Sequence, residues 1–272
     1  MSDRTCLVTG ANSGLGLATA IELAKRGHRV VGTVRSEEKA TPLHDAAAEA
    51  GVEVEHRLLD VVDAERGAEL IDEIRPDALV NNAGYGMSAP VELVDDADAS
   101  ALIDTMLLAP VRLARAAIPH QRERGGGHVV MISSILGRIT MPMTGWYQAA
   151  KHGLEAVSDA LRQEVAGDGI HVVLVEPGFF LTSIFDDLDR DAVRYRGQGY
   201  DSAFARARQT LERSTWAMGD PASVAKTVAK AIGSSRPRAR YLVGPDAMAM
   251  DAVNPWVPTA VRDRLARFGY GL

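Results

Sequence analysis

Tyr147 and Lys151 are the residues of this sequence whose types and spacing point most directly to chemistry. On an α-helix, residues four apart lie on one face, so a phenol and an ammonium group would project into the same small volume. A free tyrosine has a pKa of ~10, and a cation held close by stabilises the phenolate and lowers that pKa. Such a pair can exchange a proton with an alcohol or carbonyl oxygen. Two ordinary surface residues on an amphipathic helix are the alternative interpretation.

A glycine-rich segment follows the apolar run at residues 6–8 and precedes a helical pattern that extends to about residue 26. Between a strand and a helix, such a turn lets backbone N–H groups and the helix N-terminus bind a pyrophosphate. Gly10 would allow the tight turn, Gly14 the close approach of a phosphate, and Gly16 the close packing of helix on strand. The segment therefore predicts a dinucleotide site, with Gly-x-x-x-Gly-x-Gly spacing.

The end of the second predicted strand, residues 30–34, indicates which dinucleotide is bound. Sites for NAD place a carboxylate there for the ribose 2′-hydroxyl, whereas a nearby arginine accommodates the 2′-phosphate of NADP. In this chain Arg35 follows the strand, and no acidic residue occurs before Glu37. Arg35 can form charge-assisted hydrogen bonds to a phosphate, although a solvated arginine at a strand end is the simpler alternative. We expect NADP(H) to be preferred over NAD(H).

Around these motifs, short β-branched runs alternate with longer helical patterns. We expect strands at 6–8, 30–34, 52–59, 78–80, 128–133, 170–175 and 241–243, and helices at about 14–26, 37–50, 65–74, 99–120, 144–164 and 222–233. This alternation is typical of a parallel sheet covered by helices on both faces. The sequence has no internal repeat or low-complexity linker. It therefore predicts one α/β domain over residues 1–272, with a Rossmann-type, doubly wound parallel sheet.

Two segments do not fit the alternation. Residues 179–219 are too long for a simple connection, and such stretches are usually lids or binding loops. We expect a helical substrate lid there, and its apolar start at residues 179–185 favours a hydrophobic substrate, although packing within the lid is the alternative. Residues 245–272, with a closing helix at 262–268, are expected to form a tail that covers the site or a partner.

Composition argues against several classes of protein. The chain is 46% hydrophobic and 24% charged, which is ordinary for a soluble globular protein. Its net charge of -6 argues against binding of nucleic acid, which usually requires a basic face. Cys6 is the only cysteine, and a strand follows the first residues directly, so we expect a reduced, cytoplasmic location. No apolar run approaches the ~18 residues of a membrane span, and the seven histidines lack ligand spacing, so no metal site is expected.

Together the motifs resemble those of the short-chain dehydrogenase/reductase family. The resemblance extends from about residue 4 to residue 244. It rests on these segments, which occur in the family's order: Thr9-Gly10-x-x-x-Gly14-x-Gly16, Asp60, Asn81-Asn82-Ala83-Gly84, Ser133-Ser134, Tyr147-x-x-x-Lys151 and Pro177-Gly178-x-x-x-Thr182. Ser134 lies thirteen residues before Tyr147, as in the family's pattern.

The resemblance implies a role for each of these residues. Tyr147 would be the general acid/base, Lys151 would lower its pKa and hold the nicotinamide ribose, and Ser134 would orient the carbonyl oxygen. The residues expected to bind the cofactor are Gly10, Asn12, Ser13, Gly14, Leu15, Gly16, Arg35, Asp60, Val61, Asn82, Ala83, Gly84, Tyr147, Lys151, Pro177, Gly178 and Thr182. The resemblance also implies a homodimer or homotetramer that packs through the helices at 99–120 and 146–166.

The expected reaction is NADP(H)-dependent hydride transfer between nicotinamide and a carbonyl or secondary alcohol. The substrate wall is expected to comprise Met87, Trp146 and residues 136–143 and 179–185, whose apolar character favours a steroid-, retinoid-, polyketide- or lipid-like substrate. One alternative is a nucleotide-responsive binding or regulatory protein that has lost catalysis. Another, a sugar-nucleotide epimerase or dehydratase, is disfavoured by the glycine spacing and by the lack of a larger C-terminal domain.

Met106 is the one departure from the family's pattern. It stands where many members have an asparagine that helps hold a water between the lysine and solvent. Pro110 has no N–H, and its ring presses on the carbonyl of Met106. We expect the freed carbonyl to bind the relay water. The alternative is that Met106 belongs to the core and that the relay is weakened or rerouted.

Overall fold

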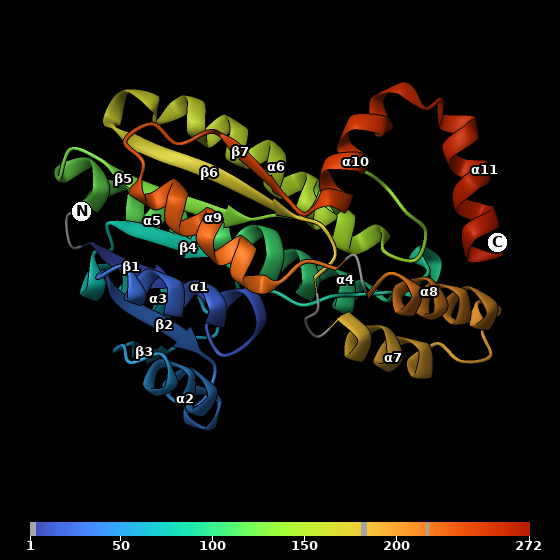
Figure 1. Cartoon of the computed structure of the whole chain (residues 1–272), viewed down its shortest axis with the longest axis horizontal. Coiled ribbons are helices and arrows are strands. Elements are labelled where there is room, and N and C mark those ends of the chain that lie inside the picture. Colours follow the sequence, from blue (N-terminus) through green and yellow to red (C-terminus); the bar gives the residue numbers. More distant parts are fainter. Residues whose placement is uncertain (1–3, 181–183, 216–217) are drawn as a thin grey trace.

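The computed structural model of the chain describes residues 4–180, 184–215 and 218–272. Within these ranges one parallel sheet has the strand order β3-β2-β1-β4-β5-β6-β7 (Figure 1). Its strands are β1 Thr5–Val8, β2 Arg29–Val34, β3 Glu55–Leu58, β4 Ala78–Asn81, β5 Gly127–Ile132, β6 Ile170–Pro177 and β7 Arg240–Val243. The strand order reverses between β1 and β4, which is where doubly wound sheets bind their ligands. The predicted fold class is confirmed.

The strands are apolar on both faces because helices cover both sides of the sheet. In β1, Cys6 and Val8 contribute to one core cluster, while Leu7 between them contributes to the other. In β4, Val80 and Leu79 divide in the same way. This explains why the strand segments read as continuous apolar runs in the sequence.

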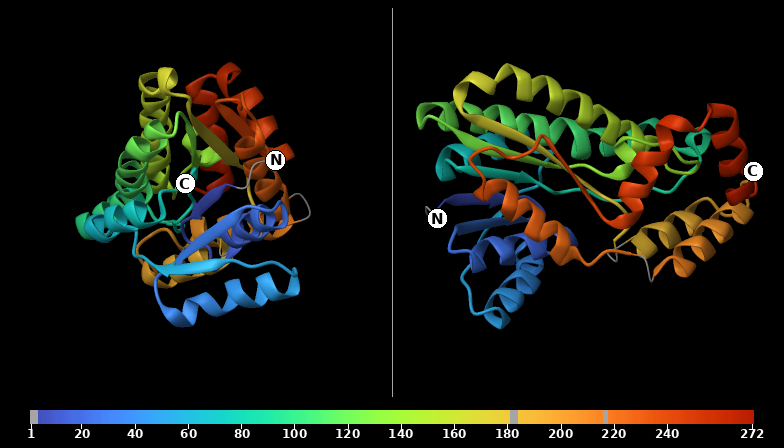
Figure 2. Two further views of the ribbon diagram at one scale, coloured as in Figure 1. Left: turned by 90° about the vertical axis from the view of Figure 1, so that its left-hand side faces the viewer. Right: turned by 45° about the horizontal axis from the view of Figure 1, so that its top comes forward.

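Helices α1 Gly14–Lys25 and α9 Pro221–Gly233 pack side by side on one face, and α2 Thr41–Glu49 covers the β2 end of that face (Figure 2). Helices α3 Ala64–Ile74, α5 Ala109–Glu123 and α6 Gly145–Glu164 cover the other face. Short 3-10 turns lie between these elements: η1 Glu37–Ala40, η2 Val91–Leu93, η4 Ile135–Gly137 and η5 Ala166–Asp168. The helices predicted from the sequence are therefore present, with differences at their ends.

The helix predicted at residues 99–120 is interrupted. It consists of α4 Asp96–Ile103, a π-helical turn η3 Asp104–Leu108, and α5. The N–H of Ala109 donates to the carbonyl of Asp104, five residues earlier, as a π turn requires. Pro110, which follows directly, has no N–H with which to continue an ordinary α-helical ladder. The prediction of one continuous helix was wrong here because a proline sits where the helix would need a donor.

Two further elements are shorter than predicted. The strand expected at 52–59 is limited to β3, which is an edge strand with partly exposed side chains. The helix expected at 37–50 divides into η1 and α2, and Pro42 lies in the first turn of α2. Proline suits that position because the first N–H groups of a helix have no partner within it.

Beyond the carboxyl ends of the strands lie α7 Ile184–Arg194, α8 Asp201–Arg213 and a C-terminal arch (Figures 1 and 2). The arch comprises α10 Pro245–Val253, η7 Asn254–Trp256 and α11 Thr259–Tyr270. Helix α7 is fixed to the segment after β4, because the N–H groups of Gly86 and Ser88 donate to Asp187 and Asp191 at 3.0 and 2.8 Å. Helix α11 returns to contact α8. None of the helices in the described ranges is long and apolar enough to cross a membrane.

Candidate active site

Ser134, Tyr147 and Lys151 come together where β5 ends and α6 begins. Ser134 precedes η4, and its Oγ accepts the N–H of Leu136 at 3.1 Å. Tyr147 and Lys151 lie on one face of α6, with Lys151 Nζ 5.8 Å from the centroid of the Tyr147 ring. Ser134 and Lys151 are buried, and Tyr147 is partly exposed. The structure thus brings the three predicted residues into one site.

The electrostatics of this site differ from the expectation. Burial lowers the pKa of Lys151 to about 8, while the carboxylate of Glu155 opposes this shift. Lys151 Nζ donates to the carbonyl of Ile132 at 2.7 Å. Burial raises the pKa of Tyr147, and interaction with the Ser134 side chain opposes the rise. Desolvation therefore dominates the pKa of Tyr147 in this structure, and the expected lowering by Lys151 stays a prediction.

Two apolar clusters adjoin Tyr147. One comprises Leu102, Ile103, Met106, Ala150, Met87 and Trp146, and the other comprises Ile135, Leu136, Ile139, Met141, Leu242, Ala247 and Met250. The predicted wall residues Met87, Trp146 and Leu136 are therefore near Tyr147. Ala247 and Met250 belong to α10, and sequence reasoning missed them because it did not say which residues of the expected tail would lie against the site.

Phe180 does not contribute to the predicted substrate wall. It is 4% exposed, packs in the main core with residues of β6 and α9, and forms an isolated bridge with Gly219. Expecting Phe180 in the substrate wall was wrong because the chain after β6 turns this apolar side chain back into the core between the sheet and α9. The predicted cofactor residue Thr182 and the side chains of residues 181–185 lie outside the described part of the chain.

The glycine turn after β1 is built by close backbone packing. Gly10 and Gly14 have φ values of +64° and +52°, which favour glycine. A Cβ at Gly10 would lie 2.9 Å from the Cα of Ala83, and a Cβ at Gly16 would lie 2.2 Å from the carbonyl oxygen of Gly10. Asn82 Nδ2 donates to that same carbonyl at 3.2 Å. The turn and the start of α1 therefore form a cradle of closely packed backbone groups, whose shape a side chain at either glycine would disturb.

The other predicted cofactor residues lie around this turn. The turn and the first residues of α1 contain Asn12, Ser13 and Leu15. Arg35 is exposed just after β2. After β3, Asp60 is exposed and Val61 is buried. Thr9 Oγ1 accepts the N–H groups of Asn82 and Ala83 at 2.9 and 3.0 Å, so β1 and β4 are joined beside the turn. All of these residues lie at the carboxyl edge of the sheet.

Pro177 and Gly178 are positioned by a residue that sequence reasoning missed. Asp246, at the start of α10, accepts the N–H of Phe179 at 2.7 Å. A Cβ at Gly178 would lie 2.2 Å from the Oδ2 of Asp246, so only glycine allows this approach. An acidic residue directly after Gly-Pro is a helix-start signal, and it could have indicated such a role.

Met106 fills space beside Gly84. Its side chain is buried, and a Cβ at Gly84 would lie 2.9 Å from its Cε. The interpretation of the Met106 side chain as core is therefore confirmed. Binding of a relay water by its carbonyl stays a prediction, and the π turn places that carbonyl in a helix segment without ordinary α-helical pairing.

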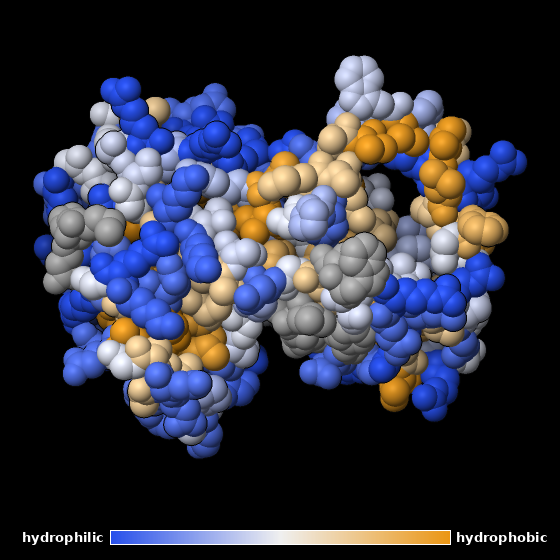
Figure 3. Space-filling view, viewed as in Figure 1, coloured by the Kyte–Doolittle hydropathy of each residue, from blue (hydrophilic) through white to orange (hydrophobic). Residues whose placement is uncertain are grey.

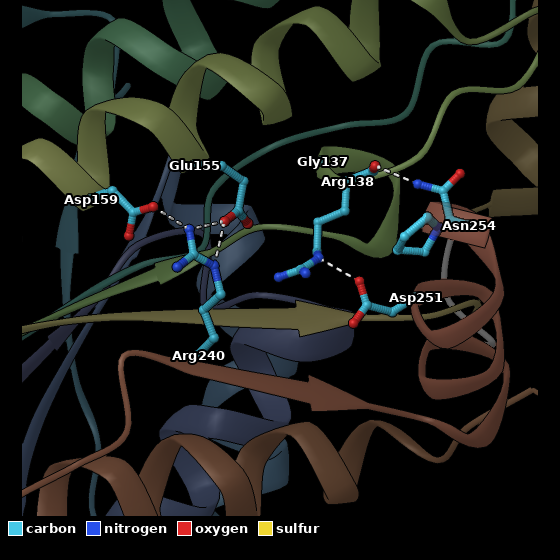
Figure 4. Close-up of a pocket in the computed structure, with 8 residues that line it drawn as sticks. Gly137, Arg138, Glu155, Asp159, Arg240, Asp251 and Asn254 are labelled. Carbon is cyan, nitrogen blue, oxygen red and sulfur yellow. Dashed lines mark hydrogen bonds and ion pairs between the residues drawn. The ribbon is translucent and has the colours of Figure 1, made fainter. Parts of the chain in front are cut away.

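A charged cluster lies between α6, β6 and β7, and its residues are not part of the family motifs (Figure 4). Glu176 of β6 is fully buried and pairs with Arg240 Nε at 3.0 Å and with Arg138 Nη1 at 3.5 Å. Arg240 Nη2 also contacts Glu155 at 3.0 Å and Asp159 at 2.6 Å. All members of the cluster except Glu176 line a cavity of about 420 Å³, together with Gly137, Asp251, Asn254 and Pro255. An acidic residue inside a buried strand is the sequence signal that could have indicated it.

Burial raises the pKa of Glu176 to about 7, and repulsion by Glu155 adds to the rise, while Arg138 and Arg240 oppose it.

In the described ranges, no three side chains of His, Cys, Asp or Glu form a group that could hold a metal ion.

We predict that Gly16→Ala weakens binding of a nicotinamide nucleotide and destabilises the fold by about 1–3 kcal/mol, because the new Cβ overpacks the Gly10 carbonyl. Fluorescence titration with NADPH and denaturant unfolding would measure both effects. Gly167→Ala is the control, since its Cβ would meet no atom within 4 Å. Unchanged binding in Gly16→Ala would contradict the cradle.

We also predict that Glu176 makes the protein less stable as the pH rises. Its folded pKa of about 7 exceeds the ordinary 4.5, so its contribution to stability is present below pH 4.5 and is lost as the pH rises to about 7. The free energy of unfolding would be measured for wild type and Glu176→Gln at several pH values across this window. Subtracting the curves removes His128, whose lowered pKa of about 4 gives the opposite slope in both proteins. A difference that does not change with pH would contradict the assignment.

Comparison with known proteins agrees with this geometry. The family model described as short chain dehydrogenase matches residues 4–192. The chain is 29% identical to a 3-ketodihydrosphingosine reductase of Bacteroides thetaiotaomicron, over the full length of both. A crystal structure of a short-chain dehydrogenase from Streptomyces avermitilis has a TM-score of 0.79 and 32% identity, covering 98% of this chain and 96% of that one. An actinorhodin polyketide ketoreductase variant with NADPH has a TM-score of 0.76 and 30% identity, covering 88% and 95%. The chain belongs to the short-chain dehydrogenase/reductase family and is an oxidoreductase of that family.

Proposed function

We propose that the protein transfers hydride between NADP(H) and the carbonyl or secondary alcohol of an apolar substrate. The observation that carries this proposal is the placement of Ser134, Tyr147 and Lys151 in one site. That site and the glycine turn both lie at the carboxyl edge of the sheet, where a dinucleotide on the turn would extend towards the tyrosine. Ketone reduction is also supported by similarity to proteins named as reductases of a ketosphingoid base and of a polyketide.

The side chains of the site can manage the proton of this reaction. The nicotinamide supplies the hydride when it is bound. A raised pKa keeps Tyr147 protonated at neutral pH, so its Oη can donate to the oxygen of a carbonyl substrate. Ser134 Oγ accepts from Leu136, which leaves its own hydrogen for the same oxygen. Lys151 stabilises the tyrosinate that forms.

The residues present fit a dinucleotide. The positive φ values of Gly10 and Gly14 form a tight turn that leads into the N-terminus of α1, where backbone N–H groups favour an anion. Arg35 is exposed after β2. Within the described part of the chain, its side chain forms no hydrogen bond or ion pair. We assign it to the 2′-phosphate of NADP(H).

An apolar substrate fits the walls around Tyr147. Both adjoining clusters consist of apolar and aromatic side chains, and methionines occur in each. Figure 3 shows an opening framed by the C-terminal arch, with apolar surface along its edge. We assign α7 and α8 to a lid and the arch to the outer wall of the substrate site. The family also suggests a homodimer or homotetramer that packs through α5 and α6.

We predict that Tyr147→Phe lowers kcat by roughly 10²–10⁴-fold, because the phenylalanine has no proton to donate. NADPH oxidation against a panel of apolar ketones and aldehydes would show this loss, and NADPH binding should persist. Tyr241→Phe is the control, since the Tyr241 hydroxyl only accepts the N–H of Arg238. If wild type binds NADPH but turns over no member of the panel, the result favours a nucleotide-responsive binding protein.

We further predict that Arg35→Asp removes the preference for NADPH. Loss of charge-assisted hydrogen bonds costs about 1.5–3 kcal/mol, which corresponds to roughly ten- to hundredfold in affinity. Dissociation constants for NADPH and NADH would be compared in wild type, Arg35→Asp and Lys39→Asp. Lys39→Asp makes the same charge change at an exposed position nearby. Equal affinity of wild type for both nucleotides would contradict the assignment.

A further inference from the structure

Three side chains beside the active site meet over a single glycine. A Cβ added at Gly137 would lie 2.9 Å from Ser133 Oγ, 3.1 Å from Glu155 Cγ and 3.3 Å from Lys151 Cβ. Lys151 and Glu155 are four residues apart on α6 and therefore share a face of that helix. The absent side chain of Gly137 leaves these polar groups in one small region next to the lysine.

The same region contains buried polar atoms without partners. Ser133 Oγ, Glu155 Oε1 and Glu176 Oε2 have no hydrogen-bond partner in the described part of the chain. Their residues are 3%, 7% and 0% exposed. Buried polar atoms that lack a protein partner are the usual places for ordered water in proteins. Water here would join Lys151 to the two glutamates.

Of the two glutamates, Glu155 reaches solvent at the cavity, while Glu176 is fully buried and contacts the cavity only through its arginine partners. Arg240 contacts both of them, and Glu155 lines the cavity of about 420 Å³ together with Arg138 and Arg240 (Figure 4). The side chains of Arg138 and Arg240 are 34% and 28% exposed, so the cavity wall is wet. The pair therefore has the buried lysine on one side and a solvated cavity on the other.

Charge in this region favours a bound proton. The charged groups that face the two glutamates are Lys151 on α6, Arg138 after η4 and Arg240 on β7. Asp159 on α6 and Asp251 on α10 contact these arginines. Arg240 pairs with both glutamates and with Asp159, and Arg138 pairs with Glu176 and Asp251. Asp159 has a further partner in Arg162. Two buried carboxyl groups that contact the same guanidinium repel each other when both are ionised, which favours a proton on one of them.

We propose that Glu155 and Glu176 form a proton-exchange site that connects Lys151 to solvent through the cavity beside Gly137. This rests on the proposed function, and it supplies a proton route at a site where Met106 replaces the family's relay asparagine. The route leaves α6 towards β6 and β7 and does not use the side that Met106 occupies.

During carbonyl reduction each step moves one proton. Tyr147 gives its proton to the substrate oxygen, and the Lys151 ammonium restores it to the tyrosinate. The glutamate pair then gives its proton to the neutral lysine through water beside Ser133, and solvent in the cavity restores the proton of the pair. In alcohol oxidation all of these transfers run in reverse. The pKa values of Glu176, about 7, and Lys151, about 8, are close enough for transfer in both directions.

The test compares Glu155→Gln with Asp159→Asn. Both variants remove one carboxylate that contacts Arg240 from the same helix, but only Glu155 adjoins Lys151. We expect Glu155→Gln to lower kcat by about tenfold or more with little change in KM. The loss should grow as the pH rises, the solvent deuterium isotope effect on kcat should increase, and added imidazole should restore turnover. Asp159→Asn should show none of these changes.

The proposal is overturned if Glu155→Gln keeps the kcat and isotope effect of wild type. It is also overturned if kcat falls without a larger isotope effect and without rescue by imidazole, since a merely structural role predicts that result. Turnover that Tyr147→Phe abolishes establishes the proposed function separately. A second measurement needs no substrate: infrared spectra at neutral pH should show a protonated carboxyl band that disappears in Glu176→Gln and persists in Asp159→Asn. Absence of that band in wild type also overturns the proposal.

Discussion

The buried amine of Lys151 is the constraint on which the rest of the site depends. An amine that is removed from water needs partners, and here the carbonyl of Ile132 at the end of β5 accepts its hydrogen bond at 2.7 Å. That bond fixes the start of α6 against the sheet, and Tyr147 one turn earlier is fixed with it. Because desolvation lowers the lysine pKa to about 8, the amine can change its protonation state near neutral pH. The same burial allows the amine to carry a proton in the proposed route.

Close backbone packing at glycines holds the segments together at the carboxyl edge of the sheet. At the glycine turn, Gly16 lies against the carbonyl of Gly10, and Asn82 bridges from β4 to that carbonyl. At the other end, Gly178 allows Asp246 of the C-terminal arch to reach the chain after β6. In each case a side chain on the glycine would displace a hydrogen-bonding partner. The glycines therefore serve tertiary packing as much as they serve ligand access.

The interruption between α4 and α5 shapes one side of Tyr147. Pro110 removes a donor, the chain forms a π turn at Asp104–Leu108, and Met106 turns its side chain into the apolar cluster that includes Tyr147. That side of the tyrosine is consequently apolar. The polar groups lie on the other elements next to Lys151, where Glu155 and Glu176 share Arg240. The distribution of polar and apolar groups around α6 thus separates an apolar cluster on one side from a charged cluster on the other.

The sequence by itself determined the alternating order of strands and helices, the glycine turn, and the spacing of Tyr147 and Lys151 on one helix face. These features are local: they depend on periodicity, on glycine conformation and on residues a few positions apart. Tertiary structure decided the rest. It decided that Phe180 belongs to the core, that α10 brings Ala247 and Met250 to the tyrosine, and that burial raises the pKa of Tyr147. It also placed Glu155, Glu176 and Arg240, from three separate elements, in one cluster. Burial and long-range contact set these outcomes, and neither is encoded in the spacing of neighbouring residues.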